Sequence, residues 1–261
     1  MHEPAASPLT PVAELFAEVL TYLRRTFRVV VPVALLSTVT ANLLAFAYGP
    51  EDTLRVIAWA FVVLVVSVAT QSAVLWTVAQ ARGGVPHAAA DPLLAAIGTG
   101  GPGREAQVGV ARAVAAAIAF GPRYVGLSFV VGLAVFILAM SVFGLPVAAY
   151  LLVRWLVAGP ALVEENRSIA EAMRRSWALV EGRWWRTAGV AVLAFIGAAI
   201  PDVAGTWLGD RMPVTALTIA FYSIGAAISL TFMSIVQVLL FEDYRRATDG
   251  TPPGQQSLTG L

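Results

Sequence analysis

Residues 214–241, VTALTIAFYSIGAAISLTFMSIVQVLLF, run for 28 consecutive positions without a charged side chain. A bilayer core of roughly 30 Å is crossed by about 20 apolar residues at helical rise, so this stretch predicts a membrane-spanning helix. The same criterion selects five further stretches, at 29–48, 56–77, 124–143, 145–163 and 185–204. The sequence therefore predicts an all-α, polytopic membrane protein with about six transmembrane helices.

The break between the third and fourth predicted spans is indicated only by Gly144 and Pro146. Glycine and proline are the residues that most strongly interrupt regular structure. The two stretches therefore either cross the membrane separately or form a re-entrant pair that enters and leaves on the same side.

The composition lies outside the range of soluble globular domains. Of the 261 residues, 58% are apolar and 13% are charged, whereas a soluble domain carries about 25% charged residues. The absence of cysteine excludes disulfides and thiolate chemistry. His2 and His87 both fall outside the predicted spans, and no basic run is long enough to follow a nucleic-acid backbone. We therefore expect no cofactor, no metal site and no nucleic-acid partner.

The cationic residues, all of them arginine, gather on one side of the predicted membrane. That side has fourteen: Arg24, Arg25, Arg28, Arg82, Arg104, Arg112, Arg123, Arg167, Arg174, Arg175, Arg183, Arg186, Arg245 and Arg246. The opposite loops contain only Arg55 and Arg211, together with acidic residues. Because positively charged loops stay in the cytoplasm, the pattern predicts a cytoplasmic-membrane protein with both termini cytoplasmic and an even number of spans.

The two ends of the chain carry weaker signals. Ala45-Phe46-Ala47 has the small-x-small pattern of a signal-peptide cleavage site, but the segment before the apolar stretch is too long for a signal peptide. We expect the first span to be retained. Residues 247–261 are rich in Gly, Pro, Ser, Thr and Gln without apolar periodicity, which predicts a disordered cytoplasmic tail.

Amphipathic helices are predicted before each odd-numbered span, at 12–27, 105–120 and 168–182. In the third, Ser168 and Glu171 have the spacing of a capping box. Such helices lie in the headgroup plane with their arginines toward anionic phosphates. The chain can thus be written as three units of interfacial helix, span and span, although ordinary connecting helices packed on the bundle would give the same pattern.

The most distinctive segment runs from Arg154 to Arg186. It contains RWLVAGPALVEE at 154–165 and AEAMRRSWALVEGRWWR at 170–186. This segment resembles the membrane domain that accompanies some bacterial glycerophosphoryl diester phosphodiesterases and that also occurs alone in actinobacterial membrane proteins. The stretches 13–28 and 241–246 are similar to that family as well. The resemblance implies an all-helical multi-span architecture but no reaction, because the phosphodiesterase activity belongs to a separate domain whose His-Arg-Gly motif is missing here.

Arg154 is the most informative single residue, because it lies about halfway along the fourth predicted span. A charge at the bilayer centre costs about 2.5–3.5 kcal/mol on insertion scales, so we expect it to face the bundle interior. Expected partners are Gln71, Gln237 and Glu242 or Asp243. Arg154 is then either an anion or headgroup site, or a structural arginine bonded inside the bundle.

The other candidate polar positions lie along the same segment. They are Glu164, Glu171, Arg174, Arg175, Ser176, Trp177, Gly182, Trp185 and Arg186. Glu164 and Glu165 are expected to pair with Arg167, Arg174 or Arg186 rather than to act as a general acid and base. Trp184 and Trp185, flanked by arginines, are typical of an aromatic belt at a membrane surface.

These observations predict a non-catalytic integral membrane protein that organises or recruits partners through its arginine-rich cytoplasmic face. The expected partners are anionic lipid headgroups and a membrane or cytoplasmic protein. One alternative is a transporter or exporter for an anionic or amphipathic substrate near Arg154, and another is an enzyme that acts on lipid.

Overall fold

The computed structural model describes residues 9–47, 53–81 and 110–249, which form eight α-helices and, within these ranges, no strand. The helices are α1 (Val12–Ala47), α2 (Thr53–Ala81), α4 (Val110–Ala139), α5 (Gly144–Arg154), α6 (Ala158–Glu164), α7 (Ile169–Val180), α8 (Trp184–Gly209) and α9 (Thr215–Asp249).

Four helical stretches are long and apolar enough to cross a membrane. They are Ala115–Ala139, Gly144–Glu164, Trp184–Gly209 and Thr215–Asp249, and shorter apolar stretches cover Val30–Leu43 and Val65–Ala79. The predicted all-α membrane protein is thereby confirmed. Each of the six predicted spans overlaps one of these stretches.

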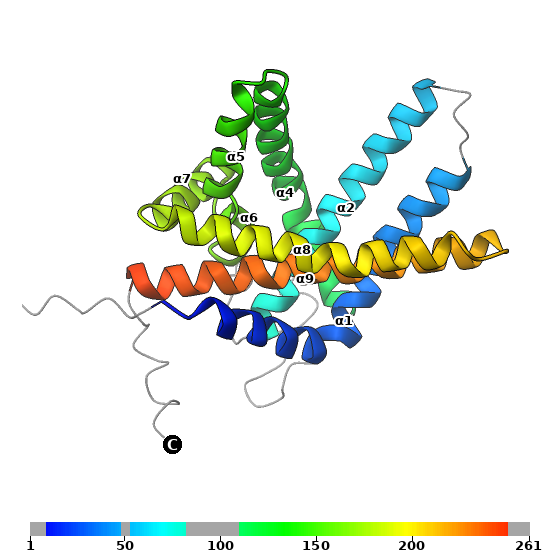
Figure 1. Ribbon diagram of the computed structural model, residues 1–261, viewed down its shortest axis with the longest axis horizontal. Helices are drawn as coiled ribbons and strands as arrows, with labels where there is room; N and C mark the ends of the chain where they lie inside the picture. The colour runs from blue at the N-terminus through cyan, green and yellow to red at the C-terminus, as the bar shows by residue number, and fades with distance from the viewer. Residues whose placement is uncertain (1–8, 48–52, 82–109, 250–261) are drawn as a thin grey trace, which may run out of the picture.

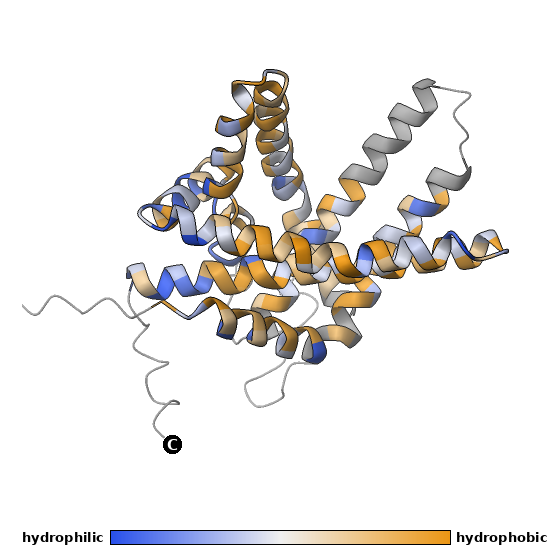
Figure 2. Ribbon diagram, viewed as in Figure 1, coloured by the Kyte–Doolittle hydropathy of each residue, from blue (hydrophilic) through white to orange (hydrophobic). Residues whose placement is uncertain are grey.

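Three hairpins diverge from a common base (Figure 1). The pairs α1–α2, α4–α5 and α8–α9 extend in different directions, while α9 lies between α8 and the first half of α1. The core is concentrated at the base, where Leu15, Phe120, Leu162, Leu179 and Tyr244 are buried together. The α4–α5 pair and much of α8 are apolar (Figure 2), and many of their large apolar side chains are exposed, such as Phe143 at 91%. Large exposed apolar surfaces of this kind mark contacts with a membrane or with another protein.

Two of the predicted interfacial helices are not separate elements. Residues 12–27 continue into the first span as the single helix α1, and residues 110–120 continue into the third span within α4; residues 105–109 lie outside the described part. α1 bends near its middle in Figure 1, and it contains Pro32, which removes one helical hydrogen bond without ending the helix. Of the three predicted units of interfacial helix, span and span, only the third has a separate helix before its first span. There Gly182, at φ +72°, separates α7 from α8.

The fourth predicted span is also divided. α5 ends at Arg154 and α6 begins at Ala158. Pro160 explains the break, because a proline has no N–H to donate and its ring collides with the carbonyl four residues earlier, here that of Leu156. At the other end of the chain, α9 continues to Asp249, so the first three residues of the predicted disordered tail are helical; residues 250–261 lie outside the described part.

The α8–α9 hairpin is held by close backbone contact between glycines. A Cβ atom on Gly225 would lie 2.5 Å from the carbonyl oxygen of Pro201 and 3.1 Å from the Cα of Gly205. Small residues that allow such an approach drive helix association in membranes, where no hydrophobic force acts between helices.

Gly225→Ala is therefore expected to destabilise the protein, by about 1–3 kcal/mol as overpacking does. Gly189→Ala is the matched control, because a Cβ atom at this exposed position of α8 meets nothing within 4 Å. Unfolding in detergent micelles measures both variants. Equal stability of the two variants would show that the glycine contact is not a determinant of the hairpin.

Candidate functional site

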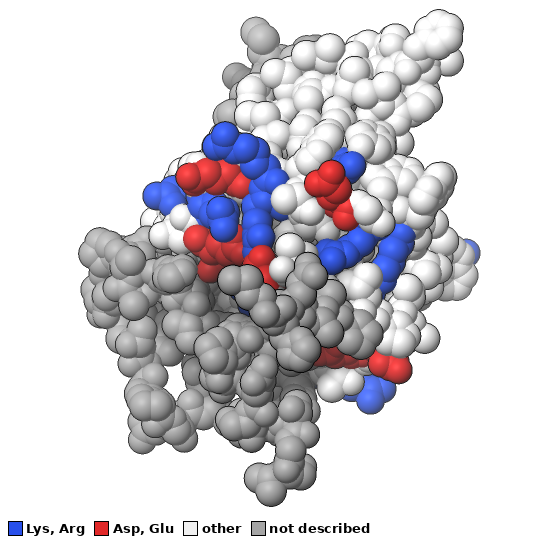
Figure 3. Space-filling view, turned by 90° about the vertical axis from the view of Figure 1, so that its left-hand side faces the viewer, with Lys and Arg blue, Asp and Glu red and all other residues white. Residues whose placement is uncertain are grey.

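Charged side chains gather at the base of the hairpins, on the side shown in Figure 3. They come from the end of α6, from α7, from the start of α8 and from the end of α9. We call this surface the charged face; its members are Glu164, Glu165, Arg167, Glu171, Arg174, Arg175, Glu181, Arg183, Arg186, Glu242, Asp243, Arg245, Arg246 and Asp249.

α7 is fixed at its start by the predicted capping box. The amide of Glu171 donates to the hydroxyl of Ser168 at 3.4 Å, and the amide of Ser168 donates to the Glu171 carboxylate at 3.0 Å. Hydrogen bonds from Ser168 lower the pKa of Glu171; the bond from its side chain has the larger effect and the bond from its backbone the smaller. A carboxyl whose pKa falls on folding stabilises the folded state above its ordinary pKa, and that contribution is lost as the pH drops through the folded-state pKa. The capping box is therefore complete at neutral pH.

Asp243 joins three segments of the chain. Its carboxylate lies 2.8 Å from Nη2 of Arg186 on α8, and its other oxygen accepts from the amide and the hydroxyl of Thr10 at 3.0 and 2.8 Å. Arg186 in turn donates to the carbonyl of Thr10 at 2.5 Å. Beside this pair, the hydroxyls of Tyr244 and Thr187 lie 2.8 Å apart in the interior. The start of the described chain, α8 and α9 are thus held at one point.

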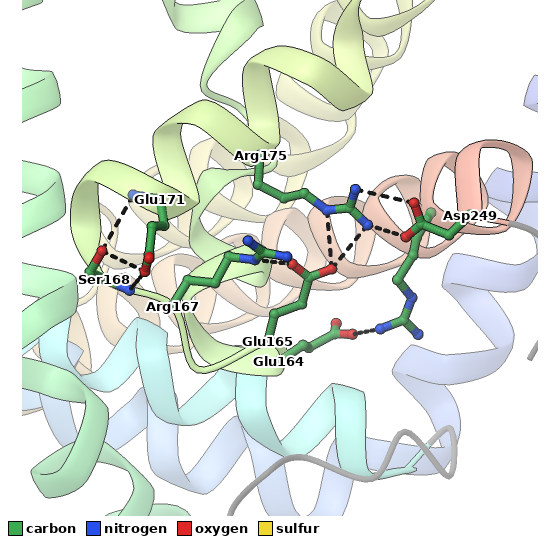
Figure 4. Close-up of polar contacts among 8 residues, drawn as sticks. Glu164, Glu165, Arg167, Ser168, Glu171, Arg175 and Asp249 are labelled. Atoms are coloured by element: carbon green, nitrogen blue, oxygen red, sulfur yellow. Dashed lines mark hydrogen bonds and ion pairs between the residues drawn. The ribbon is translucent and has the colours of Figure 1, made fainter.

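A second set of ion pairs attaches α6 and α7 to the end of α9 (Figure 4). Arg175 lies between Glu165, at 3.2 Å, and Asp249, to which it donates two hydrogen bonds. Glu165 also pairs with Arg167, and Glu164 lies 3.6 Å from Arg245. Of the partners predicted for Glu164 and Glu165, only Arg167 forms an ion pair with one of them among the described residues. The two other arginines that pair with these glutamates, Arg175 and Arg245, were not predicted.

Arg154 is not at the centre of the bundle. It ends α5 and lies against α7, where Nε donates to the hydroxyl of Tyr150 at 2.9 Å and Nη1 donates to the carbonyl of Trp177 at 3.1 Å. Its guanidinium carbon is 4.6 Å from the centre of the Trp177 ring. The hydroxyl of Ser176 donates to the carbonyl of Arg154 at 2.7 Å, which fixes the main chain as well. The expected partners Gln71, Gln237, Glu242 and Asp243 are not those found.

Aromatic rings continue from Arg154 to the start of α8. Tyr150 stacks on Trp184 with ring centres 5.8 Å apart, and Trp184 meets Trp185 edge-on at 4.7 Å. Trp185 is 83% exposed. We call Tyr150, Arg154, Trp177, Trp184 and Trp185 the aromatic-arginine cluster. A guanidinium over aromatic faces gains cation–π attraction of about 0.5–2 kcal/mol, so this cluster holds a cation in place without neutralising it.

The remaining predicted positions lie apart from the cluster or serve the backbone. Gln71 on α2 is half-buried, and Oε1 of Gln237 on α9 is buried without a hydrogen bond among the described residues. Arg174 is exposed on α7. Gly182 supplies the left-handed turn after α7. Within the described ranges, no group of three or more His, Cys, Asp or Glu residues could hold a metal ion.

Sequence reasoning missed several members of the site. Tyr150 could have been found, because it precedes Arg154 by four residues and so lies on the same face of a helix. Asp249 was assigned to a disordered tail. Thr10 carried no signal, because its role depends on a partner 233 positions away.

Comparisons with models of known protein families, with curated proteins and with solved structures gave no match. The functional argument for this chain therefore depends on the geometry of its own residues.

Asp243→Ala is expected to lower the free energy of unfolding by about 3–5 kcal/mol, because it leaves the largely buried Arg186 without its carboxylate. Asp249→Ala is the matched control. Its carboxylate is 43% exposed and Arg175 keeps Glu165, so a loss of about 1 kcal/mol or less is expected. Unfolding titrations in mixed micelles compare the two variants, and similar losses would refute the central role given to Asp243.

Proposed function

We propose that this chain is a non-catalytic, multi-pass protein of the cytoplasmic membrane that recruits a protein partner and contacts anionic lipids through its charged face. The observation that carries the proposal is the collection of charged residues from α6, α7, α8 and α9 on one face, next to apolar hairpins (Figure 3). The face has seven arginines and seven acidic residues, but Glu164, Glu242 and Asp243 are buried, so its accessible part is richer in arginine. Such surfaces at the ends of spans are attracted to anionic lipids on the cytoplasmic side.

The geometry favours a re-entrant α4–α5 pair over two separate crossings. α5 has 11 residues, which rise about 16 Å, about half of a 30 Å core. Its end, Arg154, is bonded to α7, whose exposed Glu171 and Arg174 require water or headgroups. The turn at 140–143 contains no charged residue. The pair therefore enters from the charged face and turns within the bilayer.

Single cysteines test this topology, because the chain has none of its own. With a membrane-impermeant maleimide, Arg211→Cys is expected to react in intact cells and Glu181→Cys only after permeabilisation. Ser141→Cys, in the turn between α4 and α5, is expected to react in neither case. Labelling of Ser141→Cys in intact cells would establish separate crossings instead, and the reverse pattern at 211 and 181 would overturn the orientation.

Recruitment of a protein partner is tested by charge reversal of Arg174, which is exposed on α7 and has no ion pair with a carboxylate among the described residues. We expect Arg174→Glu to reduce the recovery of cross-linked partners from native membranes at least about tenfold, the effect of about 1.4 kcal/mol. Arg211→Glu, at the opposite end of the spans, is the control and should leave recovery unchanged. If no cross-linked protein depends on Arg174, the recruiting function is wrong.

A second candidate function is transport of an anionic or amphipathic substrate. The interruption between α5 and α6, directly after Arg154, favours it, because broken helices often border substrate sites in transporters. Flux into proteoliposomes that disappears with Arg154→Gln would favour this candidate over recruitment.

A further inference from the structure

Arg154 has no carboxylate in ion-pair contact among the described residues, a property that it shares with Arg174 and Arg183 of the charged face. Arg167, Arg175, Arg186, Arg245 and Arg246 each pair with an acidic side chain. The described partners of Arg154 are a hydroxyl, a backbone carbonyl and two aromatic faces. None of these carries a charge, so the positive charge of Arg154 is not neutralised within the described part of the chain.

The guanidinium retains donors for a ligand. Arginine has five N–H groups, and Arg154 uses one on Nε and one on Nη1. Three remain without an acceptor among the described residues, one on Nη1 and both on Nη2. Adjacent N–H groups on a planar guanidinium match the two oxygens of a phosphate. The contacts to Tyr150 and Trp177 fix the plane in advance, which reduces the entropy lost when a ligand binds.

The surroundings of the Arg154 guanidinium favour an anion that belongs to a lipid. Trp177 lies against the guanidinium, and Trp184 and Trp185 continue the row of rings from Tyr150. Trp185 is largely exposed, and exposed tryptophans are enriched in the headgroup layer of a membrane. From Trp185, the exposed side of α8 continues through Gly189 and Val192 to Ile196. This distance of 11 residues is about 16 Å, close to the depth of one leaflet in a 30 Å core.

A shallow apolar hollow, open to its surroundings, begins at Ile196. Its lining comes from one side of α8, namely Phe195, Ile196, Ala199, Ile200, Val203 and Trp207. A lipid whose phosphate lies at Arg154 would place its acyl chain along α8 with its end at this hollow. A soluble phosphate would use only the guanidinium and leave the apolar side of α8 unused.

We propose that the aromatic-arginine cluster is a specific site for one anionic glycerophospholipid, with the phosphodiester on the free N–H groups of Arg154 and an acyl chain along α8. This inference rests on the proposed position of the charged face at a membrane surface. It goes beyond that proposal because it assigns a single, saturable lipid site centred on Arg154, next to the partner surface at Arg174.

The experiment uses the full chain in neutral detergent micelles, with bound lipid counted by native mass spectrometry. The probes are phosphatidylglycerol, phosphatidylcholine with the same acyl chains, and inorganic phosphate. We expect one saturable phosphatidylglycerol, retained at least about tenfold more tightly than phosphatidylcholine, as a charge-assisted hydrogen-bonded pair permits. Inorganic phosphate at equal concentration should not displace it. Displacement by inorganic phosphate would assign the site to a soluble anion and overturn the lipid proposal.

Four variants locate the site. Arg154→Gln should abolish the preference for phosphatidylglycerol, and Arg154→Lys should weaken it because lysine lacks the planar fork. Tyr150→Phe keeps the ring and removes only the hydroxyl that orients Nε, so it tests the site even if Arg154→Gln fails to fold. Arg245→Gln is the matched control, since Arg245 also lies over an aromatic ring, that of Phe241 at 5.4 Å, but is paired with Glu164, and it should bind like the wild type. Unchanged binding by both Tyr150→Phe and Arg154→Lys would overturn the proposal.

The lipid-binding experiment and the cross-linking experiment on Arg174 can be distinguished by their results. Arg174→Glu changes the recruiting surface and leaves every contact of Arg154 in place. Loss of partner recovery with normal lipid binding, or the reverse, therefore shows which of the two proposals fails.

Discussion

The ion pair between Arg186 and Asp243 is the contact on which the arrangement of the hairpins depends. The hairpins diverge toward their turns (Figure 1), so their relative positions are set at the base. There Asp243 bonds both α8 and Thr10, two residues before α1. Moving both charges out of water is costly, and such a pair is favourable only when its remaining donors and acceptors are satisfied. Thr10 satisfies one oxygen of Asp243 with two donors and accepts from Nη2 of Arg186, whereas Nη1 of Arg186 is buried without a hydrogen bond among the described residues. The pair is therefore only partly compensated, and Thr10 supplies that part from a position 233 residues away from Asp243.

The end of α9 extends this principle to the neighbouring helices. Between residues 241 and 249, acidic, aromatic and basic side chains follow one another, so successive positions of the helix face different partners. Asp243 faces α8, Arg245 faces Glu164 on α6 and Asp249 faces Arg175 on α7. Since α7 has only 12 residues, too few for a stable isolated helix, its position depends on these contacts and on its capping box. The charged face is thus a consequence of how α9 organises the base.

Sequence patterns predicted the features that depend on neighbours along the chain. The apolar stretches and the capping box of α7 are local, and they were found where expected. The position of Arg154 was wrong because hydropathy averaged over 145–163 does not detect the interruption that Pro160 imposes at Leu156. The separate helices expected at 12–27 and 105–120 failed for a related reason. The spacing of apolar residues indicates an amphipathic helix, but it does not indicate where that helix ends. A residue that ends a helix, such as Gly182, is needed to separate the amphipathic helix from the span that follows. The ion pairs of Asp243 and Asp249 join residues more than fifty positions apart, which no local pattern can specify.

The distribution of carboxylates separates arginines that hold the fold from arginines that can bind. An arginine paired with glutamate or aspartate gains less from a further anion, because its charge is already balanced. The excess of arginine on one side of the sequence therefore overstates the capacity of the charged face for lipid. Arg154 and Arg174 have no carboxylate in ion-pair contact among the described residues, and they differ in environment. Arg154 is fixed by aromatic rings beside the apolar side of α8, which suits a ligand with both phosphate and hydrocarbon, whereas Arg174 is exposed on α7, which suits a protein surface. Two kinds of contact can therefore coexist on one face without competing for the same cation.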